Sequence, residues 1–309
     1  MNKFEEDFVS VIIPVYNDTK RLKQCLQALE KQTYPQNKYE VIVVDNASEE
    51  NVKDVVSQFV QARLTFENCP GSYAARNKGI SVARGEILAF TDADCIPKED
   101  WIETGVKHLL SLEKPGIIAG NIEIFFKNSQ NPTAVELYDS ITNLQQKKIA
   151  EEAHFAATAN LFTFKKVFDQ VGLFNQQLKS GGDSEWGKRA YSLGYPIEYA
   201  EDCCVAHPAR DSLAQLYKKV ARVRGGFYQL EKLNSNQTQQ SLYKDFFKLL
   251  YKCKPPLIYA YKKSYLDRRV KNQSQKIKVF LLIILVHYRG VYERLKLLCG
   301  EPQIRSTNN

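Results

Sequence analysis

The sequence predicts an α/β protein with a doubly wound, mostly parallel sheet, followed by a basic helical C-terminal extension. Three observations support this fold class. Strand-like and helix-like segments alternate over about the first 125 residues, and the apolar run Glu86–Phe90 is typical of a buried strand. The charge changes sign along the chain: residues 1–204 hold 22 Lys and Arg against 29 Asp and Glu, whereas residues 205–309 hold 21 against 6.

The spacing of the apolar residues distinguishes the strand-like from the helix-like segments. The strand-like segments are 8–15, 39–44, 63–66 and 86–90. The helix-like segments are 18–31, 49–60 and a stretch after Gly71 that carries Ala74, Ala75 and Ile80. Ligands of doubly wound sheets lie at the carboxyl ends of the strands, so the polar residues found there should meet at one edge. These residues are Asn17, Asp45, Asp92 and Asp94.

The second half of the chain continues the pattern less regularly. It predicts strands at 116–126 and 196–200, the latter leading to Cys203–His207, and a small apolar stretch at 155–164. It predicts helices at 133–149, 165–171, 183–193 and 211–230. The polar stretch 232–241 is typical of a loop or linker. We therefore expect a catalytic domain at 1–231 and a separate basic tail at 232–309.

Composition and cysteine usage limit the possible classes of protein. The 44% hydrophobic and 25% charged content is that of an ordinary soluble globular protein. The seven cysteines are odd in number and lack a C-x-x-C pair, which favours a reducing compartment over a disulfide framework or a zinc site. The polar, acidic first residues predict no secretory signal peptide.

The basic tail suggests a polyanionic partner. Its apolar run Val279–Val286 is too short to span a bilayer as a helix, since eight residues cover about 12 Å of roughly 30 Å. An apolar stripe continues at a spacing near 3.5 residues through Ile277, Leu281, Ile284, Tyr288, Val291, Leu295 and Leu298. The stripe is compatible with an interfacial membrane helix, and equally with a helix that packs on the catalytic domain or on a partner chain.

Four segments carry the chemistry of the first half. They are Val11–Asn17, Val43–Ser48, Gly71–Gly79 and Asp92–Asp94. In order and spacing, over roughly the first 230 residues, they resemble the motifs of the family 2 glycosyltransferases. This resemblance implies the Rossmann-like GT-A fold and a nucleotide-sugar donor. Paired carboxylates after a buried strand also suit Mg²⁺ or Mn²⁺, which prefer oxygen ligands and are often shared with substrate phosphates.

The resemblance implies roles for the residues of these motifs. Pro14, Tyr16 and Asn17 are expected at the nucleotide sugar. Asp45 is expected on the uracil or ribose, with a helix N-cap as the alternative. Arg76 and Asn77 would contact the nucleotide or position the D-x-D loop, unless they only pack at the surface. Asp94 is implied as the main metal ligand, and Asp92 as a neighbour of the ribose or of a metal-bound water.

A second acidic motif, Gly181–Trp186, resembles the family segment that carries the catalytic base. It implies that Asp183 takes the proton of the acceptor hydroxyl, which is typically worth ~10²–10⁴-fold in rate. An N-cap role for Asp183 is the alternative. Glu185 is expected to support the loop or the acceptor. Trp186 either stacks on a sugar ring or belongs to the core.

The segment Cys203–Arg210 resembles the family segment whose histidine completes the metal site, so His207 would share one cation with Asp94. The guanidinium groups of Arg222 and Arg224 suit phosphate and are expected on the donor diphosphate or on a lipid-linked acceptor. Asn160 is expected near the donor sugar. Residues Lys219–Val223 stand where processive members carry Q-x-x-R-W, and this departure favours transfer of single sugars.

The leading hypothesis is an inverting, metal-dependent transferase with a UDP-sugar donor and a saccharide or lipid-linked acceptor. It would act in surface or exported polysaccharide assembly, at the cytoplasmic face of a membrane that the basic tail contacts. A nucleotide-sugar-binding protein without turnover is the main alternative. No recognition motif supports a nucleic-acid partner. A Rossmann dehydrogenase is disfavoured because no G-x-G-x-x-G follows the first strand.

Overall fold

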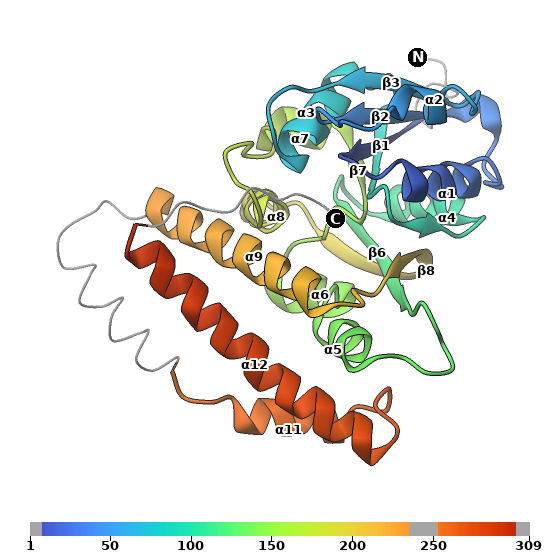
Figure 1. The fold of residues 1–309 in the computed structure, drawn as a ribbon. Coiled ribbons are helices and arrows are strands. Elements are labelled where there is room, and N and C mark those ends of the chain that lie inside the picture. The colour runs from blue at the N-terminus through green and yellow to red at the C-terminus, as the bar shows by residue number, and fades with distance from the viewer. Residues whose placement is uncertain (1–7, 235–252, 301–309) are drawn as a thin grey trace.

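The computed structural model describes residues 8–234 and 253–300 and has one eight-stranded sheet at its centre (Figure 1). The spatial order of the strands is β3-β2-β1-β4-β7-β6-β8-β5. The strands are β1 (Val9–Val15), β2 (Tyr39–Asp45), β3 (Ala62–Phe66), β4 (Ile87–Thr91), β5 (Ile96–Pro97), β6 (Ile117–Phe125), β7 (Asn160–Phe164) and β8 (Ile197–Pro208). Strands β3, β2, β1 and β4 are parallel, β7 is antiparallel to both neighbours, and β6 and β8 are again parallel.

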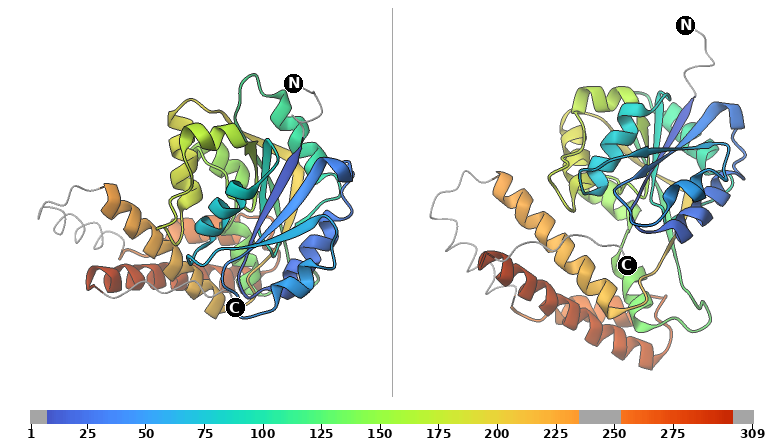
Figure 2. Two further views of the ribbon diagram at one scale, coloured as in Figure 1. Left: turned by 90° about the horizontal axis from the view of Figure 1, so that it is seen from above. Right: turned by 45° about the horizontal axis from the view of Figure 1, so that its top comes forward.

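Helices cover both faces of the sheet (Figures 1 and 2). Alternate residues of β1 point to opposite sides, so Val11 and Ile13 belong to one core cluster and Ile12 to the other. The first cluster includes α1 (Thr19–Leu29), α2 (Val52–Val56) and α4 (Trp101–Ser111). The second includes α3 (Ser72–Val82), α6 (Gln146–Ala153), α7 (Lys165–Val171) and α8 (Gly182–Ser192). The predicted doubly wound, mostly parallel fold is confirmed.

The loop after β2 shortens one predicted helix. The expected helix 49–60 is limited to α2, Val52–Val56. The backbone N–H of Glu49 donates to Oδ1 of Asn17 at 2.7 Å, which holds the segment in the loop. The helix then begins only where Asn51 accepts a hydrogen bond from the backbone of Asp54.

The expected helix 133–149 is two helices, α5 (Ala134–Thr142) and α6. Leu144 between them has φ of 45°, a left-handed conformation that no helix continues through. The buried side chain of Gln146 explains the break, since its amide group bonds both to the backbone of Ala157 and to the carbonyl of Asn160. A tertiary contact therefore overrides the local helical period.

The C-terminal extension is helical, as predicted, and packs on the catalytic half (Figure 1). Its helices are α11 (Leu257–Tyr265) and α12 (Gln273–Leu298), and α12 runs along α9 (Leu213–Asn234) and α5. The predicted boundary at 231/232 lies inside α9, so the first residues of the expected 232–241 loop are helical, and 235–241 lie outside the described residues. Among the described residues, no helix combines the length and apolarity needed to cross a bilayer.

The tail helix buries a different face from the predicted stripe. Its buried residues include Val279, Leu282, Ile283 and Val286. Four members of the stripe are instead exposed, namely Ile277, Leu281, Tyr288 and Leu295, whereas Ile284 packs against the core beside α5. Helix α12 is therefore apolar both where it packs and on its outer side.

Candidate active site

A cleft of about 330 Å³ opens at the carboxyl ends of β1 and β4, facing α9. Eight of the predicted site residues line it: Pro14, Tyr16, Arg76, Asp92, Asp94, Asp183, His207 and Arg222. They come from segments up to 208 positions apart in the chain and meet because parallel strands present their carboxyl ends at one edge. The structure thus brings together the acidic motifs, the histidine and two of the three predicted arginines, Arg76 and Arg222.

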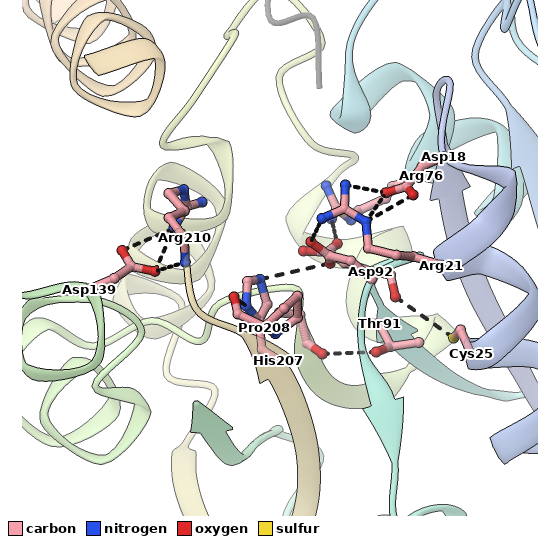
Figure 3. A network of polar contacts seen from close by, with 12 residues as sticks. Asp18, Arg21, Cys25, Arg76, Thr91, Asp92, Asp139, His207, Pro208 and Arg210 are labelled. Carbon is pink, nitrogen blue, oxygen red and sulfur yellow. Dashed lines mark hydrogen bonds and ion pairs between the residues drawn. The ribbon is translucent and has the colours of Figure 1, made fainter. Parts of the chain in front are cut away.

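The D-x-D loop follows β4 directly and is held on both sides (Figure 3). The carbonyl of Asp92 accepts the backbone N–H of Cys95 at 3.0 Å, which closes a tight turn. The carboxylate of Asp92 forms an ion pair with Arg76, whose side chain is only 5% exposed. Arg76 therefore orients Asp92, and because the guanidinium is buried, the pair is well shielded from solvent.

Asp94 points toward the histidine at the end of β8. Its Oδ1 lies 3.8 Å from Nε2 of His207, and its Oδ2 lies 3.7 Å from Nη1 of Arg21. Nδ1 of His207 is 2.8 Å from the carbonyl oxygen of Pro208. A carbonyl only accepts, so Nδ1 carries the proton of the neutral ring, and Nε2, on the side of Asp94, then carries the lone pair. This is the tautomer that a metal-binding imidazole requires.

Asp94, Cys95 and His207 place potential ligand atoms within 4.8 Å of one another. Cys95 is not among the ligands predicted from the sequence. Burial raises the pKa of its thiol well above the ordinary value, and the charges of Asp94 and Asp92 raise it further. Sulfur is also a softer donor than Mg²⁺ or Mn²⁺ prefer. Carboxylate oxygen and imidazole nitrogen therefore form the part of this group that fits such a cation.

Asp183 lies in the first turn of α8 and lines the same cleft as the D-x-D loop. Its Oδ1 accepts the hydroxyl of Tyr73 at 3.2 Å and the backbone N–H of Ser184 at 2.9 Å. Gly181, not Asp183, is the N-cap of the helix, so the capping alternative does not hold. Burial raises the pKa of Asp183 although the charge of Arg76 and both hydrogen bonds oppose the shift. A raised pKa makes this carboxylate a stronger base.

Basic side chains from α9 and the preceding loop form the opposite wall. Arg210 and Lys219 pair with the fully buried Asp139, at 3.1 and 3.5 Å. Burial, then the charge of Arg210, lowers the pKa of Lys219 to about 7 even though Asp139 opposes the shift. In the described chain no carboxylate pairs with Arg222, whose pKa burial also lowers. This wall is suited to an anionic ligand.

Two predicted site residues are core residues instead. Trp186 is fully buried, stacks on Phe168 with ring centroids 4.3 Å apart, and donates its Nε1–H to the carbonyl of Gly172 at 2.8 Å. A buried ring cannot stack on an acceptor sugar. Asn160 is also fully buried, where its amide group bonds the indole of Trp101 and two backbone carbonyls. Its side chain does not line the cleft, although the neighbouring Ala159 does.

Three other predicted site residues contact neighbouring elements outside the cleft. Asn77 exchanges two hydrogen bonds with the backbone of Phe174, at 2.8 and 3.1 Å. Glu185 pairs with Arg189 one turn along α8 at 2.9 Å. Arg224 lies against α12 and lines a second cavity between that helix and α9. Each is engaged by a neighbouring element, and none lines the cleft.

Asn17 and Asp45 support the cleft without lining it. Oδ1 of Asp45 accepts the backbone N–H of Ser48 at 2.9 Å, and the N–H of Asn17 donates to the Ser48 hydroxyl at 3.0 Å. Asp45 is not the N-cap of α2, since Asn51 has that role. The neighbour Asn46 lines the cleft instead and holds the loop before α3 through a bond from Gly71.

Sequence reasoning missed several cleft residues: Asp18, Asn46, Tyr73, Lys179 and Lys219. A signal existed for one of them. Lys219, Arg222 and Val223 recur at helical spacing on α9 and line the cleft together. The others lie on loops and helix ends, where no period marks the side that faces a ligand.

Comparisons with known proteins agree with this geometry. The glycosyl transferase family 2 model matches residues 10–172. "Glycosyltransferase AglE" of Haloferax volcanii is 44% identical over 228 residues, covering 72% of this chain and 74% of that protein. A Methanococcus voltae protein named "Dolichyl N-acetyl-alpha-D-glucosaminyl phosphate 3-beta-D-2,3-diacetamido-2,3-dideoxy-beta-D-glucuronosyltransferase" is 23% identical over 227 residues, covering 69% of this chain and 70% of its own.

Among solved structures, the mannosyltransferase PcManGT of Pyrobaculum calidifontis, in complex with GDP-Man and Mn²⁺, superposes with a TM-score of 0.62. The identity is 18%, and the match covers 93% of this chain and 86% of that one. At this identity the likeness shows a shared GT-A fold. The family model spans more than half of the chain and AglE is a substantial relative, so the protein belongs to glycosyl transferase family 2.

Proposed function

We propose that this glycosyltransferase is a metal-dependent, inverting, non-processive enzyme that moves one sugar from a nucleotide diphosphate donor to a saccharide or lipid-linked acceptor. The observation that carries the proposal is the meeting of Asp92, Asp94, Asp183 and His207 in one cleft. We further propose a role in surface or exported polysaccharide assembly, at the cytoplasmic face of the cell membrane. The Methanococcus voltae relative, whose name describes a lipid-phosphate-linked substrate, supports a lipid-linked acceptor.

The donor is proposed to lie along the strand ends. Tyr16 and Pro14 at the end of β1 line a wall of the cleft together with Asn46, and would contact the nucleotide. Asn17 and Asp45 hold this wall through Ser48. The diphosphate would lie between the D-x-D loop and Arg222, whose guanidinium is open to the cleft. We favour a UDP-sugar, and the GDP-Man complex of PcManGT makes guanosine donors the first comparison.

Asp94 and His207 would hold a divalent cation, Mn²⁺ or Mg²⁺, and Asp92 lines the same cleft. A bound cation would act as a Lewis acid that neutralises negative charge on the departing diphosphate. Arg76 fixes Asp92 beside this position, and the bond from His207 to the Pro208 carbonyl keeps Nε2 available. The chemistry and the positions of these side chains therefore suit a bound Mn²⁺ or Mg²⁺.

Asp183 is proposed as the base. Its carboxylate removes the proton of the acceptor hydroxyl while that oxygen bonds to the anomeric carbon of the donor sugar. The bond from this carbon to the diphosphate oxygen breaks at the same time, so the nucleotide leaves as the diphosphate and the configuration inverts. Burial raises the pKa of Asp183 and so brings that pKa nearer to the pH at which the enzyme works. Tyr73 holds the carboxylate in place through its 3.2 Å bond.

A turnover assay tests the proposal. Purified protein is incubated with single nucleotide sugars, Mn²⁺ and lipid-phosphate or saccharide acceptors, and nucleotide release and product configuration are measured. We expect release with an inverted product, and a loss of ~10²–10⁴-fold in kcat for Asp183→Asn. Glu185→Gln is the matched control, because this carboxylate is on the same helix but pairs with Arg189.

Three results would contradict the proposal. Retained anomeric configuration would exclude direct displacement. Equal turnover by the wild type and Asp183→Asn would exclude Asp183 as the base, and binding with no turnover by either would favour a nucleotide-sugar-binding protein instead.

A further inference from the structure

The outer side of α12 is an apolar stripe, which we define as Ile277, Leu281, Leu285, Tyr288, Tyr292 and Leu295. These side chains are between 42% and 58% exposed. They recur at intervals of three or four residues, so they lie along one face over about five turns of the helix. A row of six large exposed side chains is unusual on a protein surface and indicates a surface that contacts something apolar.

The other side of α12 is already occupied. Leu282 and Val286 pack with Leu216 of α9, and Val279 and Ile283 pack with Leu137 and Ile141 of α5. Figures 1 and 2 show α12 alongside α9, on the side away from the central sheet. The helix is therefore fixed to the catalytic domain by one face, and the stripe is directed outward.

Charge distinguishes the possible occupants of the stripe. Residues 253–298 carry 11 Lys and Arg against 2 Asp and Glu. A second copy of the chain would bring two strongly positive surfaces together, which is unfavourable. An anionic lipid surface matches both properties, because the apolar side chains enter the interface and the basic ones meet the headgroups.

The borders of the stripe have the composition of an interfacial helix. Lys278 is exposed beside Ile277 and Leu281, and Nζ of Lys296 lies 5.5 Å from the ring centroid of Tyr292. Long basic side chains of this kind keep their apolar stems on the hydrocarbon and their charges at the headgroups. Tyr288 and Tyr292 add the amphipathic rings that favour the membrane–water boundary.

We infer that the apolar stripe of α12 is a docking surface for an anionic bilayer, on which the helix lies in the plane of the interface without crossing it. The inference deepens the proposed function and rests on it for the location of the acceptor. Helix α9 connects the two sites: Leu216 packs on α12, while Lys219 and Arg222 one and two turns further on line the cleft. A docked α12 would therefore hold the cleft at a set height above the lipid, where the head of a lipid-linked acceptor can enter it.

Vesicle co-sedimentation of the full-length protein tests the inference. Phosphatidylcholine vesicles are compared with vesicles that also contain phosphatidylglycerol, at low and high salt. We expect binding to the anionic vesicles that weakens with salt. The double change Leu281→Glu with Leu285→Glu should reduce the partition coefficient at least about tenfold, as should Lys278→Glu with Lys296→Glu.

Matched controls separate a local effect from net charge. Leu110→Glu with Leu193→Glu introduces the same charge at exposed apolar positions of the catalytic domain, and Lys20→Glu with Lys23→Glu reverses two exposed charges on α1. Both pairs should bind vesicles nearly as well as the wild type. Thermal stabilisation by a nucleotide sugar, measured on every variant without lipid, reports folding and donor binding independently of docking.

Three outcomes would overturn the inference without touching the proposed function. They are no vesicle binding by the wild type, unchanged binding by the Leu281/Leu285 or the Lys278/Lys296 variant, and a dimer in light scattering that the Leu281/Leu285 variant dissociates. Loss of donor stabilisation in the wild type would instead count against the proposed function.

Discussion

At the scale of single residues, the cleft shows how neighbours give similar carboxylates different properties. Asp92 is paired with a buried arginine, whereas Asp183 has hydrogen bonds from Tyr73 and Ser184 but no ion pair among the described residues. Burial disfavours the charged form of Asp183 and raises its pKa. Asp92 is therefore suited to orienting ligands, and Asp183 to accepting a proton.

This environment predicts the pH dependence of turnover. In the proposed mechanism Asp183 acts as an ionised base, so the acid limb of the kcat/KM profile should lie above the ordinary carboxylate range. The Tyr73 hydroxyl stabilises the charged form, so Tyr73→Phe should raise the pKa of Asp183 and move the limb to higher pH. Steady-state rates across pH measure the shift. A limb that stays in place, or one that Glu185→Gln moves equally, would argue against the assignment.

The same residue predicts an effect on stability. The folded state binds the Asp183 proton more tightly than the unfolded state, because the folded pKa is raised. Its contribution to the free energy of unfolding therefore falls as the pH rises from the pKa of Asp183 in the unfolded chain to its pKa in the folded protein. At pH 7, above both values, the group does not stabilise the fold. Asp183→Asn should consequently keep or raise the melting temperature at pH 7 while turnover is lost. A lower melting temperature in calorimetry would show that the ionised group stabilises the fold.

A third prediction concerns the cation. Asp94→Ala and His207→Ala each remove a ligand of the type that Mn²⁺ accepts, so each should raise the Mn²⁺ concentration needed for stabilisation by a nucleoside diphosphate by roughly tenfold or more. Thermal shift with increasing Mn²⁺ measures this. Cys95→Ala is the control, since its buried thiol is a poor ligand for such ions. Equal loss in the control variant would mean that the thiol takes part.

At the scale of secondary-structure elements, side chains buried between elements place the strands that bear the site. Asn160 at the start of β7 accepts the Trp101 indole N–H of α4 at 2.8 Å and donates to the carbonyls of Asn121 and Cys203 in β6 and β8. One amide group therefore ties three strands and a helix together just behind the D-x-D loop. Its role is structural although it lies close to the cleft in space.

Asn160→Ala would leave an indole N–H and two carbonyls without their partner in the core. Unpaired buried groups cost about 1–3 kcal/mol each, so we expect the free energy of unfolding to fall by at least ~2 kcal/mol. Urea denaturation measures the change, with the exposed Asn37→Ala as a control that should stay within about 0.5 kcal/mol. Unchanged stability together with weaker donor binding would support the prediction that Asn160 contacts the donor.

At the scale of the whole molecule, donor binding should raise thermal stability, because residues of β1, β8, the D-x-D loop and three helices line the cleft. A ligand at 100 times its Kd adds about 2.7 kcal/mol to the free energy of unfolding. A nucleotide sugar with Mn²⁺ should therefore raise the melting temperature by several degrees. Thermal shift across uridine, guanosine and thymidine diphosphate sugars measures the preference, with adenosine diphosphate sugars as controls. Equal shifts in melting temperature for all four bases would contradict a cleft wall that selects one nucleotide.

The local sequence by itself determined the parallel half of the sheet and most of the acidic site. Runs such as Val9–Val15 are recognisable without tertiary context, and polar residues directly after them necessarily reach the same edge. Asp92 and Asp94 are predicted in this way, whereas Asp183 and His207 are predicted from the resemblance of their segments to motifs of the family. The break at Leu144 was not, because the Gln146 contact that causes it comes from the segment before β7.

Only the tertiary structure decided which way each side chain points. Trp186 follows Asp183 by three residues, yet one is sealed in the core and the other faces the cleft; Arg222 and Arg224 are two residues apart on α9, yet they line different cavities. Helical spacing gives relative directions, but the packing partner determines which direction is outward. The same applies to α12, whose sequence has apolar residues on two sides of the helix. Contact with α9 and α5 determines which of these two sides is buried.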